Sequence, residues 1–334
     1  METRKILFLP KSSLARDILS PRARATLESL GQVVWNTSDS DISADDLAAL
    51  LPGAEAVVTS WGAPAFTPQL LAAADRLRIV GHAAGTVKHL MPPEGYARGI
   101  IVLSAAPIIA DSVAEYTLWA MLSMQRDLFR YAQRMKAERG WRVAEDGYGH
   151  DLYYKKVGIV SASMVGRRVI KLLKPFACDV MVYDPYLSAA EAQALGVRTV
   201  SLEELFATSD IVSVHAPTTP ETKQMIQARH FQALRDGVLF VDTARSWVLD
   251  EGALVTELRR GRFQAVLDVF DQEPLSADHP LRDLDNVFLT PHISGAATES
   301  RLRLVEAIAD DLRRFFAGEP LQYAIQPERL SIMA

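Results

Sequence analysis

Three side chains in the second half of this chain have the chemistry needed to reduce a 2-oxo acid: Arg245, Glu273 and His292. An arginine presents a planar fork that binds a carboxylate and polarises the neighbouring ketone. A histidine can donate a proton near neutral pH to the alkoxide that forms when hydride arrives. A carboxylate beside that histidine keeps the imidazole protonated and oriented. Each of the three follows an apolar run of strand length, and in an open α/β sheet the ligand lies at the carboxyl ends of the strands.

Each of these residues also has an ordinary structural explanation. An arginine after a strand is usually solvated, a glutamate before a proline is usually part of a turn, and a histidine after a proline is usually a satisfied loop residue. Each ordinary explanation is the better one for a single residue. The presence of all three behind a dinucleotide-type unit favours the catalytic interpretation.

That unit occupies residues 157–186 and would position a cofactor. An apolar run at 157–160 is followed by three small residues, by helix-spaced apolar residues from Met164, and by a second apolar run that ends at Asp184. A helix N-terminus attracts a pyrophosphate. Asp184 can accept hydrogen bonds from ribose hydroxyls and would repel a 2′-phosphate. The stretch therefore predicts a βαβ unit that binds NAD rather than NADP.

The glycine motif of this unit is incomplete. The usual G-x-G-x-x-G reads here as Ser161-x-Ser163-x-x-Gly166. Only the third glycine, which lets helix and strand pack closely, is present. For this stretch alone, an ordinary βαβ unit remains an equal alternative.

Short apolar runs alternate with helical segments in both halves of the chain, a pattern typical of parallel sheets covered on both faces. Strands are expected at residues 5–9, 32–35, 56–60, 77–81 and 100–103, and again at 211–214, 238–241, 265–269 and 287–289. Two long helices are expected besides. The first, over residues 111–139, would begin at a capping box, Ser112 to Glu115, and would act as a domain connector or subunit contact. The second is amphipathic and covers 298–316.

The overall composition excludes several classes of protein. A length of 334 residues suggests about two domains. A net charge of −5 argues against nucleic acid or an anionic membrane as a partner. The seven histidines show no metal-ligand spacing, so no metal is expected. The single cysteine, Cys178, suits the reducing cytoplasm and reads as a small packed side chain rather than a nucleophile.

Four strings of residues resemble the D-isomer-specific 2-hydroxyacid dehydrogenase family. They are V-x-T-A-R at 241–245, D-V-F-x-x-E-P at 268–274, T-P-H-I-x-G at 290–295 and H-x-P-x-T-x-x-T at 215–222. The resemblance implies two α/β domains, each with a doubly wound parallel sheet. A Rossmann nucleotide-binding domain would cover 107–297, and a discontinuous flavodoxin-like substrate domain would cover 1–106 and 298–334.

The resemblance also implies roles for individual residues. Arg245, Glu273 and His292 match the catalytic trio. The implied substrate-binding residues are Ala84, Gly85, Thr86 and Arg245. The implied cofactor-binding residues are Met164, Val165, Gly166, Asp184, His215, Pro217, Thr222, Thr243, Ala244, Arg245, Asp268, His292, Ser294 and Gly295.

The function implied is an NAD-dependent oxidoreductase that interconverts a small 2-oxo acid and a D-2-hydroxy acid, with His292 as proton donor or acceptor. The resemblance further implies a cytoplasmic homodimer joined through the helix around 112–139. With no regulatory segment beyond the last helix, the longer phosphoglycerate dehydrogenases are not expected. The alternative is an NAD(H)-sensing binding protein of the corepressor type. Trp247 stands where the family usually has a small residue. It narrows the active site, covers an apolar substrate tail, or packs on the domain surface.

Overall fold

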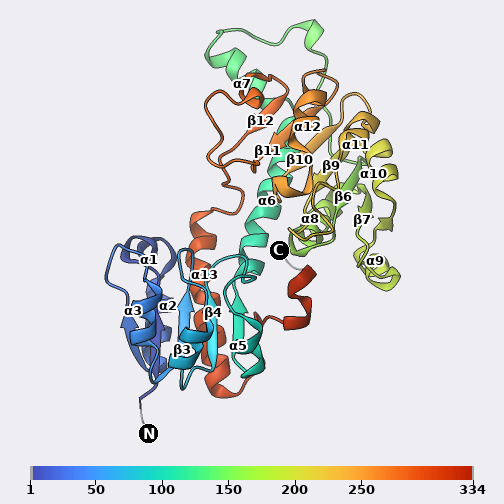
Figure 1. Cartoon of the computed structure of the whole chain (residues 1–334). Helices are drawn as coiled ribbons and strands as arrows, with labels where there is room; N and C mark the ends of the chain where they lie inside the picture. Colours follow the sequence, from blue (N-terminus) through green and yellow to red (C-terminus); the bar gives the residue numbers. More distant parts are fainter. Residues whose placement is uncertain (1–2, 333–334) are drawn as a thin grey trace. The chain divides into compact units, whose positions relative to one another are not determined.

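The computed structural model describes residues 3–332 and divides them into two compact units (Figure 1). The first unit consists of the residues up to Ile109 together with Ala296–Ile332, and the second is Ala110–Gly295. Residues 1–2 and 333–334, which the sequence assigns to the substrate domain, lie outside the described part. Each unit contains one parallel sheet, so the predicted α/β class with two sheets is confirmed.

The first unit is built on five parallel strands in the order β2-β1-β3-β4-β5, which is the flavodoxin-like order. The strands are β1 Lys5–Phe8, β2 Gln32–Trp35, β3 Ala54–Thr59, β4 Ile79–His82 and β5 Ile101–Ser104. Every residue of β3 and β4 is buried, because helices cover both faces of the sheet. This explains why these strands read as continuous rather than alternating apolar runs.

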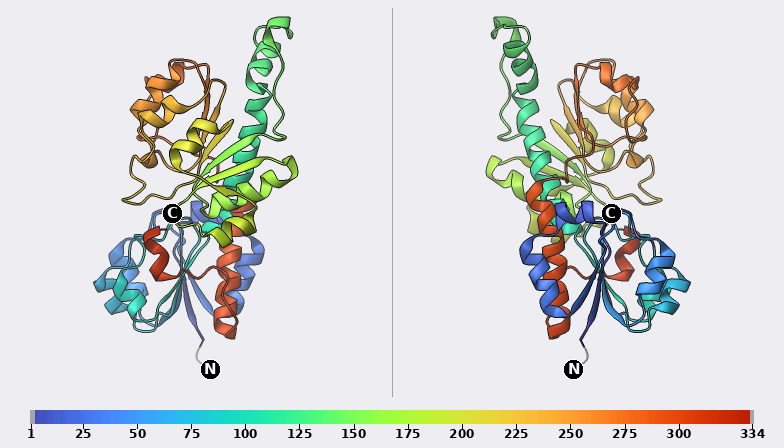
Figure 2. Two further views of the ribbon diagram at one scale, coloured as in Figure 1. Left: turned by 90° about the vertical axis from the view of Figure 1, so that its right-hand side faces the viewer. Right: turned by 90° about the vertical axis from the view of Figure 1, so that its left-hand side faces the viewer.

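Two groups of helices cover the first sheet (Figure 2). On one face lie α1 Ser12–Ile18, α2 Pro21–Leu30 and the C-terminal α13 Thr298–Ala317. On the other lie α3 Ala44–Leu50, α4 Pro68–Ala73 and α5 Pro93–Ala97. Helix α13 approaches β4 so closely that a Cβ at Gly81 would lie 2.2 Å from Cγ2 of Ile308. The C-terminal helix therefore belongs to the unit formed by the first hundred residues.

The second unit contains seven parallel strands in the order β12-β11-β10-β9-β6-β7-β8. They are β6 Lys156–Val160, β7 Asp179–Tyr183, β8 Arg198–Thr199, β9 Ile211–Val214, β10 Leu239–Asp242, β11 Gln264–Leu267 and β12 Val287–Leu289. The chain order reverses at β6, whose two neighbours are β7 and β9. Such a reversal is the switch point at which a doubly wound sheet binds its ligand.

Helices again cover both faces of this sheet. One face carries α6 Ala106–Gln125 and α8 Met164–Leu173, and the other carries α10 Leu202–Thr208, α11 Ala228–Ala233 and α12 Glu251–Leu258. The remaining helices are α7 Leu128–Lys136 and α9 Ala189–Leu195, with short 3₁₀ turns η1 Ala144–Asp146, η2 Lys174–Phe176, η3 Ser246–Val248, η4 Pro280–Asp283 and η5 Pro327–Ile332, the last of these in the first unit.

The expectation of one helix over 111–139 is wrong at its start and in its middle. Helix α6 begins at Ala106, whose N–H donates to the Ser104 hydroxyl, so Ser112 lies inside the helix and caps nothing. The helix stops at Gln125, and Asp127 adopts a left-handed backbone with φ of 51° before α7 begins. No glycine or proline marks this break. The break coincides with a tertiary contact, since Phe129 of α7 stacks on Phe288 of β12 with ring centroids 3.9 Å apart.

A buried carboxylate ties the loop after α7 back onto that helix. Asp146 accepts hydrogen bonds from Arg130, Arg134 and the Val143 N–H, and its side chain is only 4% exposed. These donors hold the pKa of Asp146 well below its usual range. Within residues 3–332, no helix combines the length and the apolar character that crossing a membrane requires.

Candidate functional site

The three predicted catalytic side chains follow three neighbouring strands of the second unit. Strands β10, β11 and β12 are adjacent and parallel, so their carboxyl ends meet at one edge of the sheet. Arg245 follows β10, Glu273 follows β11 and His292 follows β12. Sheet order, which the sequence leaves open, therefore brings these residues to the same edge.

His292 and Glu273 form a hydrogen-bonded pair. His292 Nδ1 lies 2.7 Å from Glu273 Oε2, and the second carboxylate oxygen accepts the Phe270 N–H at 3.1 Å. The side chains are 43% and 36% exposed, so the pair is open to solvent in the second unit. With Nδ1 held by the carboxylate, Nε2 is the ring nitrogen left for proton transfer. The pair has the geometry of an oriented general acid.

Asp268 fixes the loop that carries His292. This carboxylate is fully buried and accepts three hydrogen bonds: from Thr290 Oγ1 at 2.6 Å, from the Ile293 N–H at 2.9 Å and from the Ser294 N–H at 2.8 Å. The bonds fall on both sides of His292, whose φ of 53° is unusual for a residue with a side chain. Asp268 therefore holds the histidine in a strained backbone conformation, which the loop would relax without these hydrogen bonds.

A tyrosine from α6 extends this network. The Tyr116 hydroxyl lies 2.6 Å from Thr290 Oγ1, and burial raises its pKa to about 12. Tyr116 thus stays neutral and connects α6 to the histidine loop. Sequence reasoning missed this contact and had no signal for it, because the two residues are 174 positions apart.

Arg245 projects from a turn that two buried polar residues support. The Ala244 N–H donates to Asp242 Oδ1 at 2.9 Å, and Thr243 Oγ1 lies 3.3 Å from Thr117 Oγ1. The Arg245 side chain is exposed, and Nη1 donates only to the Ala244 carbonyl. No ion pair to Arg245 is present among residues 3–332, so its fork is available to a substrate carboxylate.

The turn between β6 and α8 has the shape of a pyrophosphate-binding turn. A Cβ at Gly166 would lie 2.1 Å from the Ser161 carbonyl oxygen, so a side chain cannot fit there. Ser161 adopts a φ of 77°, the left-handed region that a glycine would occupy without strain. Ser163 caps α8 instead, its Oγ accepting the Gly166 N–H at 3.3 Å. The two serines thus keep the turn of a glycine motif by different means.

Asp184 faces this turn from the end of β7. Its Oδ2 accepts the Ala162 N–H at 2.8 Å and the Ser161 hydroxyl at 3.2 Å, and Oδ1 accepts the Tyr186 N–H at 2.8 Å. A carboxylate has about four lone-pair sites, so acceptor capacity remains for a ribose hydroxyl. A dinucleotide fits this arrangement: the Asp184 carboxylate, the N-terminus of α8 and the tight turn at Gly166. The bond from Ser161 to Asp184 is a feature that the sequence did not reveal.

The loop after β9 contains three more predicted cofactor residues, and its side chains are engaged within the protein. His215 is buried with Nε2 3.0 Å from Ser213 Oγ, and burial lowers its pKa to about 3. Thr222 Oγ1 donates to the Pro217 carbonyl at 2.6 Å. Trp247 packs on the same loop, with Nε1 donating to the Thr219 carbonyl at 3.0 Å. Trp247 therefore makes a packing contact on the domain surface, one of the roles that the sequence leaves open.

The predicted substrate loop belongs to the first unit, at the carboxyl end of β4. Ala84 is buried and Thr86 is exposed. The Gly85 carbonyl accepts from Ser104 Oγ at 2.8 Å, and Thr86 Oγ1 accepts the Lys88 N–H at 3.3 Å. The loop is therefore held by the neighbouring strand β5 and by its own turn.

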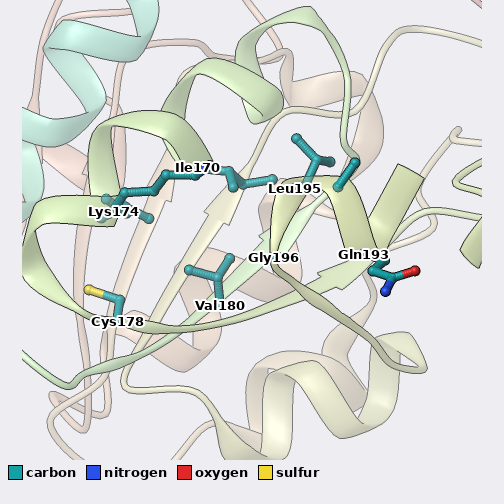
Figure 3. A pocket seen from close by; sticks show the side chains of 9 residues that line it. Ile170, Lys174, Cys178, Val180, Gln193, Leu195 and Gly196 are labelled. Carbon is teal, nitrogen blue, oxygen red and sulfur yellow. The ribbon is translucent and has the colours of Figure 1, made fainter. Parts of the chain in front are cut away.

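A hollow of about 300 Å³ in the second unit lies elsewhere (Figure 3). Its lining residues are Ile170, Leu173, Lys174, Cys178, Val180, Gln193, Ala194, Leu195 and Gly196. It adjoins the start of β7, whereas Asp184 follows the end of that strand. Burial raises the pKa of the Cys178 thiol to about 11, and its Sγ donates to the Leu152 carbonyl. Within residues 3–332 no group of three or more His, Cys, Asp or Glu side chains could hold a metal ion.

A family model described as "D-isomer specific 2-hydroxyacid dehydrogenase, NAD binding domain" matches residues 118–294. The match covers the turn at 161–166, Asp184 and the three catalytic candidates. It therefore coincides with the part of the second unit in which the site geometry lies.

Curated relatives are about one third identical to this chain over the residues that align. The D-3-phosphoglycerate dehydrogenase of Archaeoglobus fulgidus is 33% identical over 285 residues, which are 85% of this chain and 54% of that protein. The glyoxylate reductase of Korarchaeum cryptofilum is 34% identical over 255 residues, which are 75% of this chain and 76% of the reductase. The chain spans about half the length of the phosphoglycerate dehydrogenases that it matches.

Solved structures with the same fold cover nearly the whole chain. A phosphoglycerate oxidoreductase from Rhizobium etli is 25% identical with a TM-score of 0.83, covering 98% of this chain and 99% of its own. A protein of Thermus thermophilus is 26% identical with a TM-score of 0.76, covering 96% of this chain and 100% of its own.

Proposed function

Since this chain belongs to the D-isomer specific 2-hydroxyacid dehydrogenase family, we propose that it interconverts a small 2-oxo acid and a D-2-hydroxy acid with NAD as cofactor. The observation that carries this proposal is the His292–Glu273 pair, 2.7 Å apart, at the sheet edge to which Arg245 also belongs. A proton donor and a carboxylate-binding cation are the two groups that hydride addition to a 2-oxo acid requires of a protein.

The roles follow from the chemistry of each group. When bound, NADH supplies the hydride. Arg245 binds the substrate carboxylate and polarises the ketone, while His292 gives its Nε2 proton to the oxygen that becomes the hydroxyl. Glu273 stabilises the imidazolium before transfer and orients the ring. In the opposite direction His292 removes the hydroxyl proton.

We assign cofactor contacts along the carboxyl edge of the second sheet. The N–H groups of Met164 and Val165, at the start of α8, would bind the pyrophosphate, with Gly166 allowing the close approach. Asp184 would accept from the adenosine ribose. The further contacts proposed are His215, Pro217, Thr222, Thr243, Ala244, Arg245, Asp268, His292, Ser294 and Gly295.

The first unit would then serve as the substrate domain, over residues 1–106 and 298–334, and the second as the NAD-binding domain, over 107–297. We propose that Ala84, Gly85 and Thr86 bind the substrate carboxylate together with Arg245. The support for this role is the position of the loop at the carboxyl end of β4, the end at which parallel sheets bind ligands.

The alternative, an NAD(H)-sensing binding protein, predicts cofactor binding without turnover. The curated relatives are dehydrogenases and reductases, which favours the enzyme. The test is NADH oxidation with a panel of 2-oxo acids that includes glyoxylate. His292→Ala should lower kcat by ~10²–10⁴-fold and leave the Kd for NADH nearly unchanged, because the histidine acts chiefly in the transition state. NADH binding with no turnover on any acid of the panel would favour the binding protein.

We further propose a homodimer formed through the segment 119–154. Nine of the thirteen large hydrophobic side chains exposed in the described part of the chain lie in this segment, among them Trp141 at 71% and Tyr148 at 84% exposed. A concentration of exposed apolar side chains on one segment is typical of a subunit contact. Helix α7 and the loop after it reach away from the sheet of their unit (Figure 2), as a dimerisation arm would.

Sedimentation velocity of the wild type and of Trp141→Asp tests this assignment. A dimer that the substitution weakens is expected, and a monomer at all concentrations would refute it. We also propose a cytoplasmic location, since the only cysteine, Cys178, is unpaired. The net charge of −5 gives no support to a nucleic-acid or membrane partner.

A further inference from the structure

Two buried carboxyl groups lie side by side at the ends of adjacent strands, and they are hydrogen-bonded very differently. Asp242, the last residue of β10, is 1% exposed, and Asp268, just after β11, is fully buried. The Asp268 N–H donates to the Asp242 carbonyl at 3.0 Å. The Asp268 side chain accepts three hydrogen bonds. The Asp242 side chain accepts one, from Ala244, and its Oδ2 is buried with no partner among the described residues.

This asymmetry decides which of the two carries a proton. A buried carboxylate is stable only when hydrogen bonds or opposite charges replace the water it has lost. Three donors replace the water that Asp268 has lost, whereas Asp242 lacks a donor on one oxygen and lies beside the Asp268 carboxyl group. A neutral acid with one unpaired O–H is far less costly in such a place than an ion.

The surrounding charges agree with this assignment. Burial raises the pKa of Asp242 to about 7, against the opposing effects of the Ala244 N–H and the Arg245 guanidinium, and the Asp268 and Glu251 carboxylates raise it further. On the remaining neighbour, β9, the register partner of Asp242 is Val214. His215 follows it, and its low pKa keeps the ring uncharged.

We propose that Asp242 is a positioning residue that works as an uncharged carboxylic acid. It holds the turn that carries Arg245, and because it is neutral it does not compete with the substrate carboxylate for the guanidinium. Its Oδ1 accepts the N–H of Ala244, the residue directly before Arg245. Ionisation would place a poorly hydrated negative charge next to that turn. The guanidinium would then be attracted to Asp242, in competition with the substrate carboxylate.

Unfolding experiments test the acid form without relying on catalysis. The isosteric variant Asp242→Asn mimics the neutral acid, and Asp285→Asn, at an exposed position of the same unit, is the matched control. A carboxyl whose pKa is raised by folding loses stability as pH rises towards the folded value. Relative to Asp242→Asn, the wild-type unfolding constant should therefore rise by about tenfold per pH unit between pH 5 and pH 7, and then level off.

The control should run parallel to the wild type over the same range. A wild-type to Asp242→Asn difference that does not change with pH would overturn the proposal. If Asp242→Asn does not fold, infrared spectra of the folded wild type with ¹³C-labelled aspartate provide the second test. A protonated carboxyl band present at pH 6 and lost by pH 9 is expected, and its absence at pH 6 would overturn the proposal.

Steady-state kinetics test the effect on Arg245, a step that rests on the proposed function. The KM for glyoxylate should rise above pH 7 in the wild type and in Asp285→Asn but remain level in Asp242→Asn. Any change of kcat with pH that does not arise from Asp242 should be common to all three. Identical KM profiles in wild type and Asp242→Asn would overturn the role in positioning. If the wild type turns over no 2-oxo acid, the proposed function fails. The unfolding experiments still decide whether Asp242 is protonated in the folded protein.

Discussion

Replacing Ser161 by glycine should tighten NADH binding while changing stability little. The structure separates the contributions to stability. Relief of the left-handed backbone, with φ of 77°, should stabilise the fold by ~1–2 kcal/mol. The added freedom of a glycine in the unfolded chain costs about 0.4–1 kcal/mol. Loss of the bond to Asp184, long at 3.2 Å and half-exposed, costs about 1 kcal/mol. These changes nearly cancel.

The effect on affinity has a different origin. Strain at Ser161 is present with and without cofactor, so its relief does not alter the Kd. The three hydrogen bonds to Asp184 leave about one lone-pair site for a ribose hydroxyl, and loss of the Ser161 hydroxyl would free a second site on Oδ2 for the other ribose hydroxyl. Ser163 Oγ likewise accepts the Gly166 N–H at the helix end that attracts the pyrophosphate. About 1 kcal/mol regained at these groups corresponds to a roughly fivefold lower Kd in the double variant.

The assay is calorimetric titration of NADH into the wild type, Ser161→Gly, Ser161→Ala and the Ser161→Gly/Ser163→Gly double variant. Ser161→Ala is the control, since it removes the hydroxyl but retains the Cβ and the strained backbone. It should share the gain in affinity and lose stability. Weaker binding by the double variant would mean that the serines are ligands of the cofactor, and the reasoning would be refuted.

Three further outcomes are expected. Glu273→Gln should lower kcat and move the optimum for reduction to lower pH, because the charge that stabilises protonated His292 at 2.7 Å is removed; an unchanged pH profile would contradict the assignment. NADH should be preferred over NADPH by about tenfold or more in kcat/KM, and Asp184→Ser should narrow this preference, since the carboxylate repels a 2′-phosphate. Asp146→Asn should increase hydrogen exchange at the Val143 amide, whose N–H the carboxylate accepts. Because folding lowers the pKa of Asp146, the wild type should lose this protection only as pH falls below the ordinary range of an aspartate. Equal exchange in both proteins at pH 7 would mean that Asp146 does not hold the loop after α7.

The elements and the chemistry of the site could be predicted from the sequence because their signals are local. Continuous apolar runs identify strands buried on both faces, and the residue that follows each run identifies the edge at which Arg245, Glu273 and His292 emerge. The stop of α2 at Gly31 and the cap of α12 at Asp250 likewise depend only on neighbouring residues.

Tertiary structure alone decided the contacts between distant parts of the chain. The break between α6 and α7 has no glycine or proline to mark it. Phe129 and Phe288, which stack beside the break, are far apart in the sequence and become neighbours only when β12 pairs with β11. The orphan oxygen of Asp242 arises in the same way, since Asp242 and Asp268 become neighbours only when β10 pairs with β11. Sequence records which groups a chain carries, but burial and hydrogen-bond partners are properties of the packed sheet, and these determine which carboxyl keeps its charge.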